Sequence, residues 1–166
     1  EISECLVGSE MCIRDRALDA GLDVGVYFFS QAITPEEARQ EADYVLSLLE
    51  SYPITCPVVY DWEPITFAEG ARTDQLENEV LTQCAAAFCQ QIAQAGYTPA
   101  VYFNQEMGYF SFDLKELSPF QFWLAEYDSY PSFYYGFTMW QYTHEGRVDG
   151  IQTPVDWNLD FSGLKR

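Results

Sequence analysis

The feature that most constrains this chain is a strand–helix–strand–helix–strand alternation over residues 22–104. Three apolar segments, residues 22–30, 56–60 and 99–104, have the length and composition of buried strands. The two longer segments between them place their apolar residues at helical spacing. Strands joined by crossover helices pair in parallel, because the helix carries the chain back to the starting end of the sheet. We therefore predict an α/β fold built on a parallel sheet.

Both predicted helices carry a start or a stop signal. The first begins at Thr34, an N-cap residue that is followed by Pro35 and by Glu37, a capping-box glutamate. The second covers residues 74–95 and ends before Gly96. One face of each helix is apolar and is expected to pack inward, with Ala38, Ala42, Val45, Leu46 and Leu49 in the first helix and Leu76, Val80, Cys84, Phe88 and Ile92 in the second.

The helical pattern weakens after residue 104. Residues 105–120 are predicted to form a loop with short helical turns, and further strands are predicted at 122–127, 137–143 and 155–159. A (β/α) barrel is the natural closed form of such a chain, but these barrels usually need at least ~200 residues. The chain has 166 residues. We therefore expect an incomplete, modified (β/α) barrel that lacks its first one or two strands.

The first sixteen residues do not resemble the rest of the chain. Residues 6–15 match one reading frame of a transposase-type sequencing adapter, Leu-Val-Gly-Ser-Glu-Met-Cys-Ile-Arg-Asp. Because the match is contiguous, we interpret residues 1–16 as a non-native segment and exclude them from fold reasoning. Cys5 and Cys12 then carry no functional information. The adapter-like segment stands where the missing strands are expected, in agreement with the short length of the chain.

Acidic residues dominate the charge, with 26 Asp and Glu against 8 Lys and Arg and a net charge of −18. A nucleic-acid-binding protein needs a basic surface, as does a protein that binds an anionic membrane, so we expect neither partner. No apolar run approaches the ~20 residues of a membrane span. Residues 1–4 do not resemble the start of a signal peptide. An uncharged sugar remains a suitable ligand.

The cysteines and the histidine carry no recognisable site. The five cysteines match no zinc or disulfide framework, and we interpret Cys56, Cys84 and Cys89 as ordinary, partly buried thiols. His144 is the only histidine and is interpreted as a loop residue. A Ser-His-Asp arrangement has no supporting motif, and the sequence contains no cluster of metal ligands. We therefore expect neither a metal nor a cofactor.

Two carboxylates, Asp61 and Glu63, end the second predicted strand. Alternation along a strand places both side chains on one face, and barrel enzymes carry their catalytic groups at the C-terminal ends of strands. Repulsion between close carboxylates raises the pKa of one, which leaves a protonated acid beside an ionised partner. Glycoside hydrolysis requires such a pair. The spacing alone is also compatible with two solvated acids, but the apolar run at 57–60 favours the functional interpretation.

At this point the chain resembles glycoside hydrolase family 25. The resemblance rests on several motifs whose order and spacing hold across residues 17–161, namely GVYFFS at 25–30, PEEA at 35–38, PVVYDWE at 57–63, GYTPAVY at 96–102, FWLA at 122–125, WQY at 140–142 and VDWN at 155–158. The family implies five β/α units with three trailing strands. It also implies cleavage of the β-1,4 bond between N-acetylmuramic acid and N-acetylglucosamine in peptidoglycan, by residues 17–166 as a truncated muramidase catalytic domain.

The resemblance also implies roles for individual residues. Glu63 corresponds to the general acid, Asp61 to the partner that tunes Glu63 and stabilises the transition state, and Asp156 to a late-strand aspartate that lines the site. One departure matters, because the family carries another aspartate on its first strand, in a Gly-Ile-Asp-Val-Ser type motif that this sequence lacks. We therefore expect the chain as it stands to be poorly stable and weakly active or inactive.

The remaining candidates would contact substrate. Aromatic residues suited to stacking on sugars, and amides suited to hydrogen bonding, are Tyr27, Phe29, Tyr102 and Trp123, and Asn104 and Gln141. Aromatic residues in strands are also common in cores, so each remains an expectation. The expected partner is the glycan strand of peptidoglycan, bound by a monomer. The location of this chain is left open, and the parent enzyme is expected to act outside the cell or at the bacterial cell wall.

Two other functions compete with this interpretation. A chitinase-like glycosidase with an acetamido-assisted mechanism also ends a barrel strand with Asp-x-Glu, but it expects further upstream aspartates where this chain has Pro57 and Val59. An inactive fragment that binds cell-wall glycans is the second alternative. Digestion of purified peptidoglycan beside chitin separates the first, and wall binding without release of reducing ends identifies the second.

Overall fold

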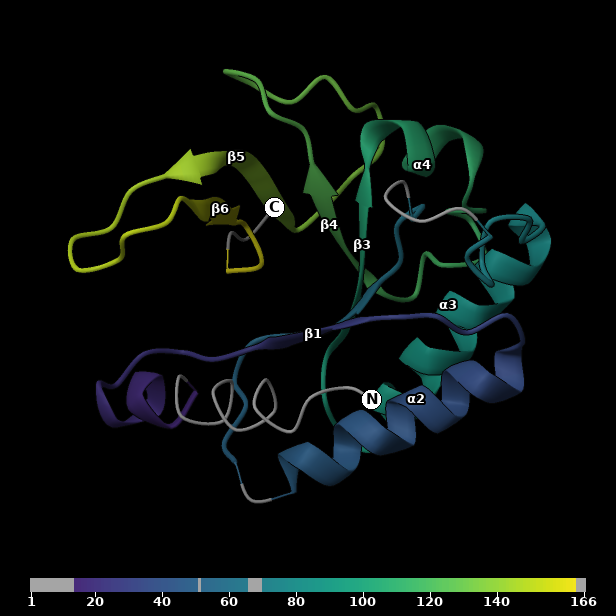
Figure 1. Ribbon diagram of the computed structural model, residues 1–166, viewed down its shortest axis with the longest axis horizontal. Helices are drawn as coiled ribbons and strands as arrows, with labels where there is room; N and C mark the ends of the chain where they lie inside the picture. Colours follow the sequence, from purple (N-terminus) through teal and green to yellow (C-terminus); the bar gives the residue numbers. More distant parts are fainter. Residues whose placement is uncertain (1–13, 51, 66–69, 164–166) are drawn as a thin grey trace.

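The computed structural model describes residues 14–50, 52–65 and 70–163, and its centre is one six-stranded sheet (Figure 1). Neighbouring strands from β1 to β5 are parallel, whereas β5 and β6 are antiparallel. The strands lie in chain order across the sheet, as β1 (Val26–Phe29), β2 (Val58–Asp61), β3 (Pro99–Asn104), β4 (Gln121–Ala125), β5 (Met139–Gly146) and β6 (Val155–Asp160). The sheet is open, and the predicted incomplete (β/α) barrel is confirmed as a half-barrel.

The first crossover helix, α2 (Pro35–Leu49), begins where the sequence predicts. The Thr34 hydroxyl accepts a hydrogen bond from the Glu37 amide at 3.2 Å, and Glu37 Oε2 accepts one from the Ile33 amide at 3.0 Å. These contacts satisfy amide groups at the helix start that have no partner within the helix. Arg72 donates to both carboxylate oxygens of Glu37, at 2.9 and 2.8 Å, and so ties a distant loop to the same turn.

The second crossover helix, α3 (Asn78–Gln94), begins at residue 78 rather than at residue 74 as predicted. Residues 71–76 instead form turns joined by backbone hydrogen bonds. The N-cap residue, Glu77, makes no side-chain capping bond. The helical spacing of apolar residues therefore begins before the hydrogen-bonded helix does, at Leu76. Gly96 adopts a φ of 91° and ends the helix as predicted.

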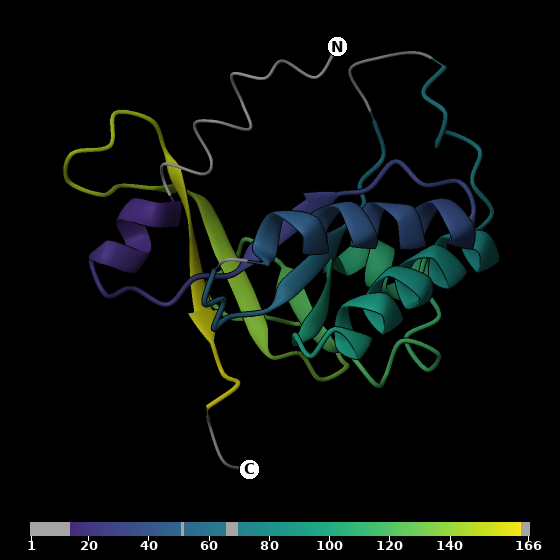
Figure 2. The same cartoon turned by 90° about the horizontal axis from the view of Figure 1, so that it is seen from below.

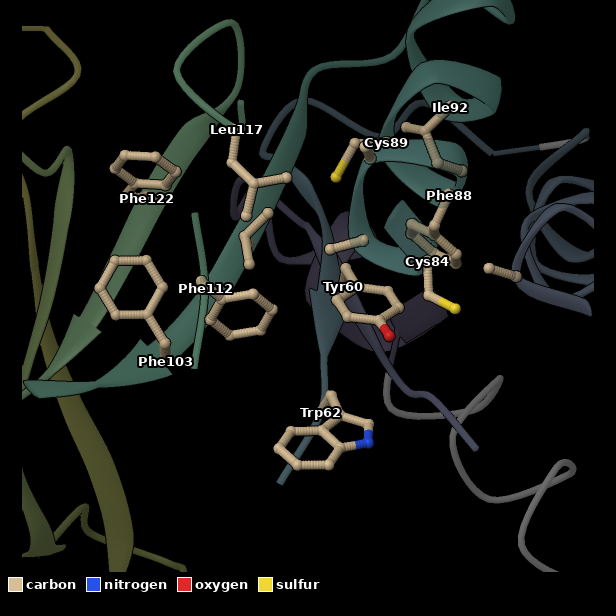
Figure 3. Packing of buried hydrophobic residues seen from close by; sticks show 14 of the residues in the cluster. Tyr60, Trp62, Cys84, Phe88, Cys89, Ile92, Phe103, Phe112, Leu117 and Phe122 are labelled. Atoms are coloured by element: carbon tan, nitrogen blue, oxygen red, sulfur yellow. The ribbon is translucent and has the colours of Figure 1, made fainter. Parts of the chain in front are cut away.

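Helices α2 and α3 pack side by side over one face of the sheet (Figure 2). Alternate strand residues point into this layer, where the Tyr60 ring centroid lies 5.5 Å from that of Phe88 (Figure 3). Further along the sheet, the Phe103 ring lies 5.3 Å from the Phe122 ring. The strand residues that alternate with these rings, Asp61 among them, therefore point to the face opposite α2 and α3.

Residues 14–19 form a short helix ahead of β1. Arg14 Nη1 donates to the Leu48 carbonyl at 3.2 Å, and the Arg14 guanidinium lies 3.2 Å from the centroid of the Tyr52 ring. These contacts connect the short helix to the end of α2. Residues 1–13 of the segment that we interpret as non-native, with Cys5 and Cys12, lie outside the described residues.

Other local predictions have mixed outcomes. Cys84 and Cys89 are buried, Cys56 is partly buried, and all three are free thiols. The loop position predicted for His144 is wrong, because antiparallel pairing with β6 extends β5 through this residue to Gly146. None of the described helices has the length and apolar character of a membrane span.

Phe88→Ala tests the packing of the helical layer. We expect the free energy of unfolding to fall by about 3–5 kcal/mol, because the substitution removes a fully buried ring that contacts Phe28 and Tyr60. Gln90→Ala, at an exposed position of α3, is the control and should change this free energy by less than about 0.5 kcal/mol. Urea denaturation measures both. If both variants lose the same free energy of unfolding, the result contradicts the packing of Phe88 between α3 and the sheet.

Candidate active site

Asp61 is the last residue of β2, and it is almost fully enclosed, with 8% of its surface exposed. Strand pairing places it opposite Phe29 of β1 and Tyr102 of β3. Its backbone carbonyl accepts a hydrogen bond from the Ser30 amide at 2.7 Å. Within the described residues, Asp61 Oδ1 is buried without a hydrogen-bond partner. Such an atom is costly in a folded protein, which marks Asp61 as a candidate functional group.

The surroundings favour the protonated form of Asp61. Burial, the larger cause, and the negative charge of Glu63 raise the pKa of Asp61 to about 7. Burial also raises the pKa of Glu63, which is partly exposed. The pair can therefore hold a proton near neutral pH, the property for which the spacing was singled out. The larger shift falls on Asp61, although the resemblance assigns the acid role to Glu63.

A buried glutamine holds two tyrosines beside this pair. Gln141 is 4% exposed, and its Oε1 accepts hydrogen bonds from the hydroxyls of Tyr102 at 2.8 Å and Tyr127 at 2.9 Å. Burial is the main cause that raises the pKa of both phenols, so both stay protonated donors. Gln141 thus orients two rings in this structure, in addition to any direct contact with a ligand.

Trp123 forms the next part of the same surface. Its ring meets that of Tyr102 edge to face, with centroids 5.1 Å apart, and its Nε1 donates to Asn158 Oδ1 at 2.9 Å. The two residues come from β4 and β6, so this bond spans β5, the strand between them. Trp123 is therefore fixed in orientation on the face that carries Asp61.

Asp156 belongs to the same electrostatic environment. After burial, the negative charges of Asp156 and Glu63 raise the pKa of Tyr127 further. Asp156 lies two residues before Asn158 on β6, so alternation places both on the face that carries Trp123. The fold thus brings Asp156, which is far from Glu63 in the sequence, to the same tyrosine, and Asp61 acts on the neighbouring Tyr102.

The family model of glycosyl hydrolases family 25 matches residues 13–151. The chain belongs to this family. No curated protein matches the chain. The family 25 match covers β1 to β5 and both crossover helices, so it includes the carboxylate pair and the tyrosines beside it.

Solved structures share the fold of this family 25 chain. The Clostridium perfringens spore cortex lytic enzyme SleM is 23% identical with a TM-score of 0.72, over 89% of this chain and 52% of SleM. The Streptococcus pneumoniae modular autolysin LytC is 22% identical with a TM-score of 0.71, over 87% of this chain and 35% of LytC. The CTP1L endolysin is 23% identical with a TM-score of 0.67, over 86% of this chain and 48% of CTP1L. The chain spans about half the length of SleM and of CTP1L, and about a third of the length of LytC.

The other predicted ligand-binding residues of the family 25 chain are two aromatic residues of the edge strand β1 and one asparagine at the end of β3. Tyr27 and Phe29 lie on the edge strand β1, 66% and 40% exposed, on the same face as Asp61. Asn104 ends β3, but its Oδ1 accepts a hydrogen bond from the Met107 amide at 2.9 Å and so caps α4 (Gln105–Phe110). Its side-chain oxygen therefore has a structural use.

Sequence reasoning missed two residues of this face, Tyr127 and Asn158. Tyr127 is the second residue after β4, and the C-terminal ends of parallel strands are where ligand-binding groups gather. Asn158 shares the alternation of Asp156, which was singled out. Both signals were present in the sequence. Within the described residues, no group of three or more His, Cys, Asp and Glu side chains is arranged to hold a metal ion.

Asp61→Asn tests the burial of this carboxyl group through the pH dependence of stability. A raised folded-state pKa stabilises the fold fully below the ordinary value of 3.8 and loses that contribution as pH rises through about 7. Because Asn does not titrate, we expect the variant to gain stability over the parent between about pH 4 and pH 8, by up to about 4 kcal/mol. Urea denaturation at both pH values measures the difference.

The matched control is Asp149→Asn, at an exposed position in the turn between β5 and β6. Its stability relative to the parent should stay nearly constant over the same pH range, because an exposed carboxylate loses little solvation on folding. An Asp61→Asn difference that does not grow with pH contradicts the burial of Asp61.

Proposed function

We propose that this chain hydrolyses the β-1,4 bond between N-acetylmuramic acid and N-acetylglucosamine in peptidoglycan. The observation that carries the proposal is the Asp61–Glu63 pair, in which Asp61 is enclosed and its Oδ1 has no hydrogen-bond partner among the described residues, on a face lined by Tyr102 and Trp123. Membership of family 25 supports a glycosidic substrate. The structurally similar autolysin LytC has been solved in complex with a synthetic peptidoglycan ligand. We assign the activity to residues 17–166.

Glu63 is the proposed general acid. It is the more exposed carboxyl of the pair, so it can reach the glycosidic oxygen, whereas Asp61 is enclosed. Proton transfer from Glu63 to that oxygen accompanies cleavage of the bond to the sugar carbon. A water molecule then supplies the hydroxyl of the new reducing end, and its other proton restores the protonated Glu63. The Asp61 carboxyl tunes the proton affinity of Glu63 and, when ionised, stabilises positive charge that develops on the sugar ring.

The aromatic residues position the substrate in this scheme. Trp123 and Tyr102 offer ring surfaces on which sugar rings can stack, and the bonds to Asn158 and Gln141 hold both in place. Asp156 lines the same face and adds to its negative potential. Such preorganisation lowers the cost of binding, because the side chains are ordered before the ligand arrives.

Weak activity is expected, for a reason visible in the sequence. The Gly-Ile-Asp-Val-Ser type motif of the family is lacking, so a further active-site carboxylate is lacking with it. In addition, β1 is an edge strand, so its outer backbone groups are unpaired with any described strand.

Glu63→Gln tests the proposed role. With purified peptidoglycan and long incubation, we expect the parent chain to release reducing ends slowly. We expect Glu63→Gln to lower the rate by about 10²–10⁴-fold, because the amide cannot donate an acidic proton. Glu50→Gln, at an exposed position after α2, is the charge-matched control and should match the parent.

Chitin digested under the same conditions separates the competing functions. If reducing ends are released from chitin at least as fast as from peptidoglycan, the result favours an acetamido-assisted chitinase and contradicts the muramidase proposal. Saturable binding to walls with no hydrolysis by the parent chain supports a glycan-binding fragment instead. Unchanged hydrolysis by the Glu63→Gln variant contradicts the assignment of the general acid.

A further inference from the structure

The segment that follows β4 is held by one carboxylate. Glu126 accepts hydrogen bonds from the Ser132 hydroxyl at 2.7 Å, from the Ser132 amide at 2.8 Å and from the Phe133 amide at 3.2 Å. Gln105 Nε2 donates to the Ser132 hydroxyl at 2.8 Å and ties the same point to α4. These bonds fix the loop at the C-terminal end of the sheet, where Asp61 also lies.

Phe133 anchors this loop in the core. It is 7% exposed, and its ring centroid lies 4.8 Å from that of Tyr109 and 5.6 Å from that of Phe103. Gly108 makes the close approach possible, because a Cβ atom at this position would come within 2.8 Å of the Phe133 ring. The loop is therefore seated against α4 in one position, and the side chains next to Phe133 are directed outward.

Four exposed rings form a continuous surface here, which we name the aromatic shelf: Phe110, Tyr109, Tyr135 and Tyr134. Successive ring centroids in this order are 6.2, 6.1 and 5.3 Å apart. The rings are 74%, 38%, 50% and 85% exposed, respectively. The Tyr134 amide also donates to the Tyr109 hydroxyl at 2.8 Å. Large rings that stay exposed on an ordered surface commonly mark a binding site.

A hollow of about 320 Å³ borders the shelf at Tyr109 and Phe110. Its other walls include polar side chains of α3, among them Glu79 and Thr82, and Glu116 from the segment after α4. Asn78 Nδ2 donates to the Phe110 carbonyl at 2.6 Å, which fixes the shelf to α3. Aromatic rings beside a few polar groups are typical of small-ligand sites, and here the carboxylates can accept hydrogen bonds from hydroxyl and amide groups.

The shelf is continuous with the candidate active site along one loop. Tyr127, near the start of the loop, donates a hydrogen bond from its hydroxyl to Gln141, beside Asp61 and Glu63. Residues 134 and 135 of the same loop contribute rings to the shelf. On the other side, α4 follows directly from the end of β3. Both parts of the shelf thus begin at the ends of β3 and β4, at the same end of the sheet as the carboxylate pair at the end of β2.

We propose that the aromatic shelf is a second glycan-binding site, which binds an uncharged, N-acetylglucosamine-containing part of a glycan strand outside the cleavage site. The carboxylates beside the shelf and the net charge of −18 disfavour an anionic ligand. A sugar ring instead offers C–H groups to the negative faces of aromatic rings, and hydroxyl and amide groups to the carboxylates. The inference rests on the proposed function for the identity of the glycan.

The test uses the Glu63→Gln chain, so that hydrolysis does not interfere, and tetra-N-acetylchitotetraose as the probe. Backbone amide NMR reports the shelf and the active-site face separately. We expect saturable shifts for residues of α4 and residues 132–135. Phe110→Ala combined with Tyr134→Ala should weaken binding at these residues by roughly tenfold or more. Tyr130→Ala, which removes a ring 71% exposed on the same loop but outside the shelf, should not.

Two results of the titration overturn the shelf proposal: amide shifts confined to the active-site face, or unchanged binding by the double variant. A third is a set of shelf amide shifts that depend on protein concentration without glycan, because they indicate that a second copy of the chain binds there. The two proposals fail separately. Absent hydrolysis by the parent chain contradicts the muramidase function but leaves the shelf titration intact. Loss of shelf binding leaves hydrolysis of short soluble glycan in place, because the shelf lies outside the catalytic face.

Discussion

The enclosure of the Asp61 carboxyl group at the end of β2 is the constraint on which this structure depends. Tyr60 packs against Phe88 in the helical layer, so the next residue must point to the opposite face. Pairing with Phe29 on one side and Tyr102 on the other then encloses Asp61 within the sheet. The packing that stabilises the half-barrel is thus the same packing that desolvates its candidate catalytic group.

Desolvation of Asp61 has a chemical consequence. An isolated carboxylate in this position is costly, and the charge of Glu63 adds to the cost, so burial and this charge raise the pKa of Asp61 to about 7. Gln141 and Asn158 hold the surrounding rings through side-chain bonds that cross the sheet. The side chains on this face are held in place beside two carboxyl groups with raised pKa values, and a glycosidase requires such a carboxyl pair.

Local pattern predicted the elements well, because each strand and helix has its own periodicity. The bounds of β3 match the prediction, and Thr34 caps α2 as expected. The start of α3 was misplaced, since an apolar residue in a turn has the same spacing as one in a helix. The strand positions of Tyr127 and Asn158 are visible in the sequence, but their partners, Gln141 and Trp123, come from other strands, and a single sequence does not display that pairing.

A ¹³C NMR titration of the Asp61 and Glu63 carboxyl groups measures the proton affinity of each group directly. We predict that Asp61 titrates near pH 7 and that Glu63→Gln moves this midpoint toward the ordinary range, because it removes the second cause of the shift. An Asp61 midpoint near the ordinary value of 3.8, unchanged by Glu63→Gln, contradicts the account.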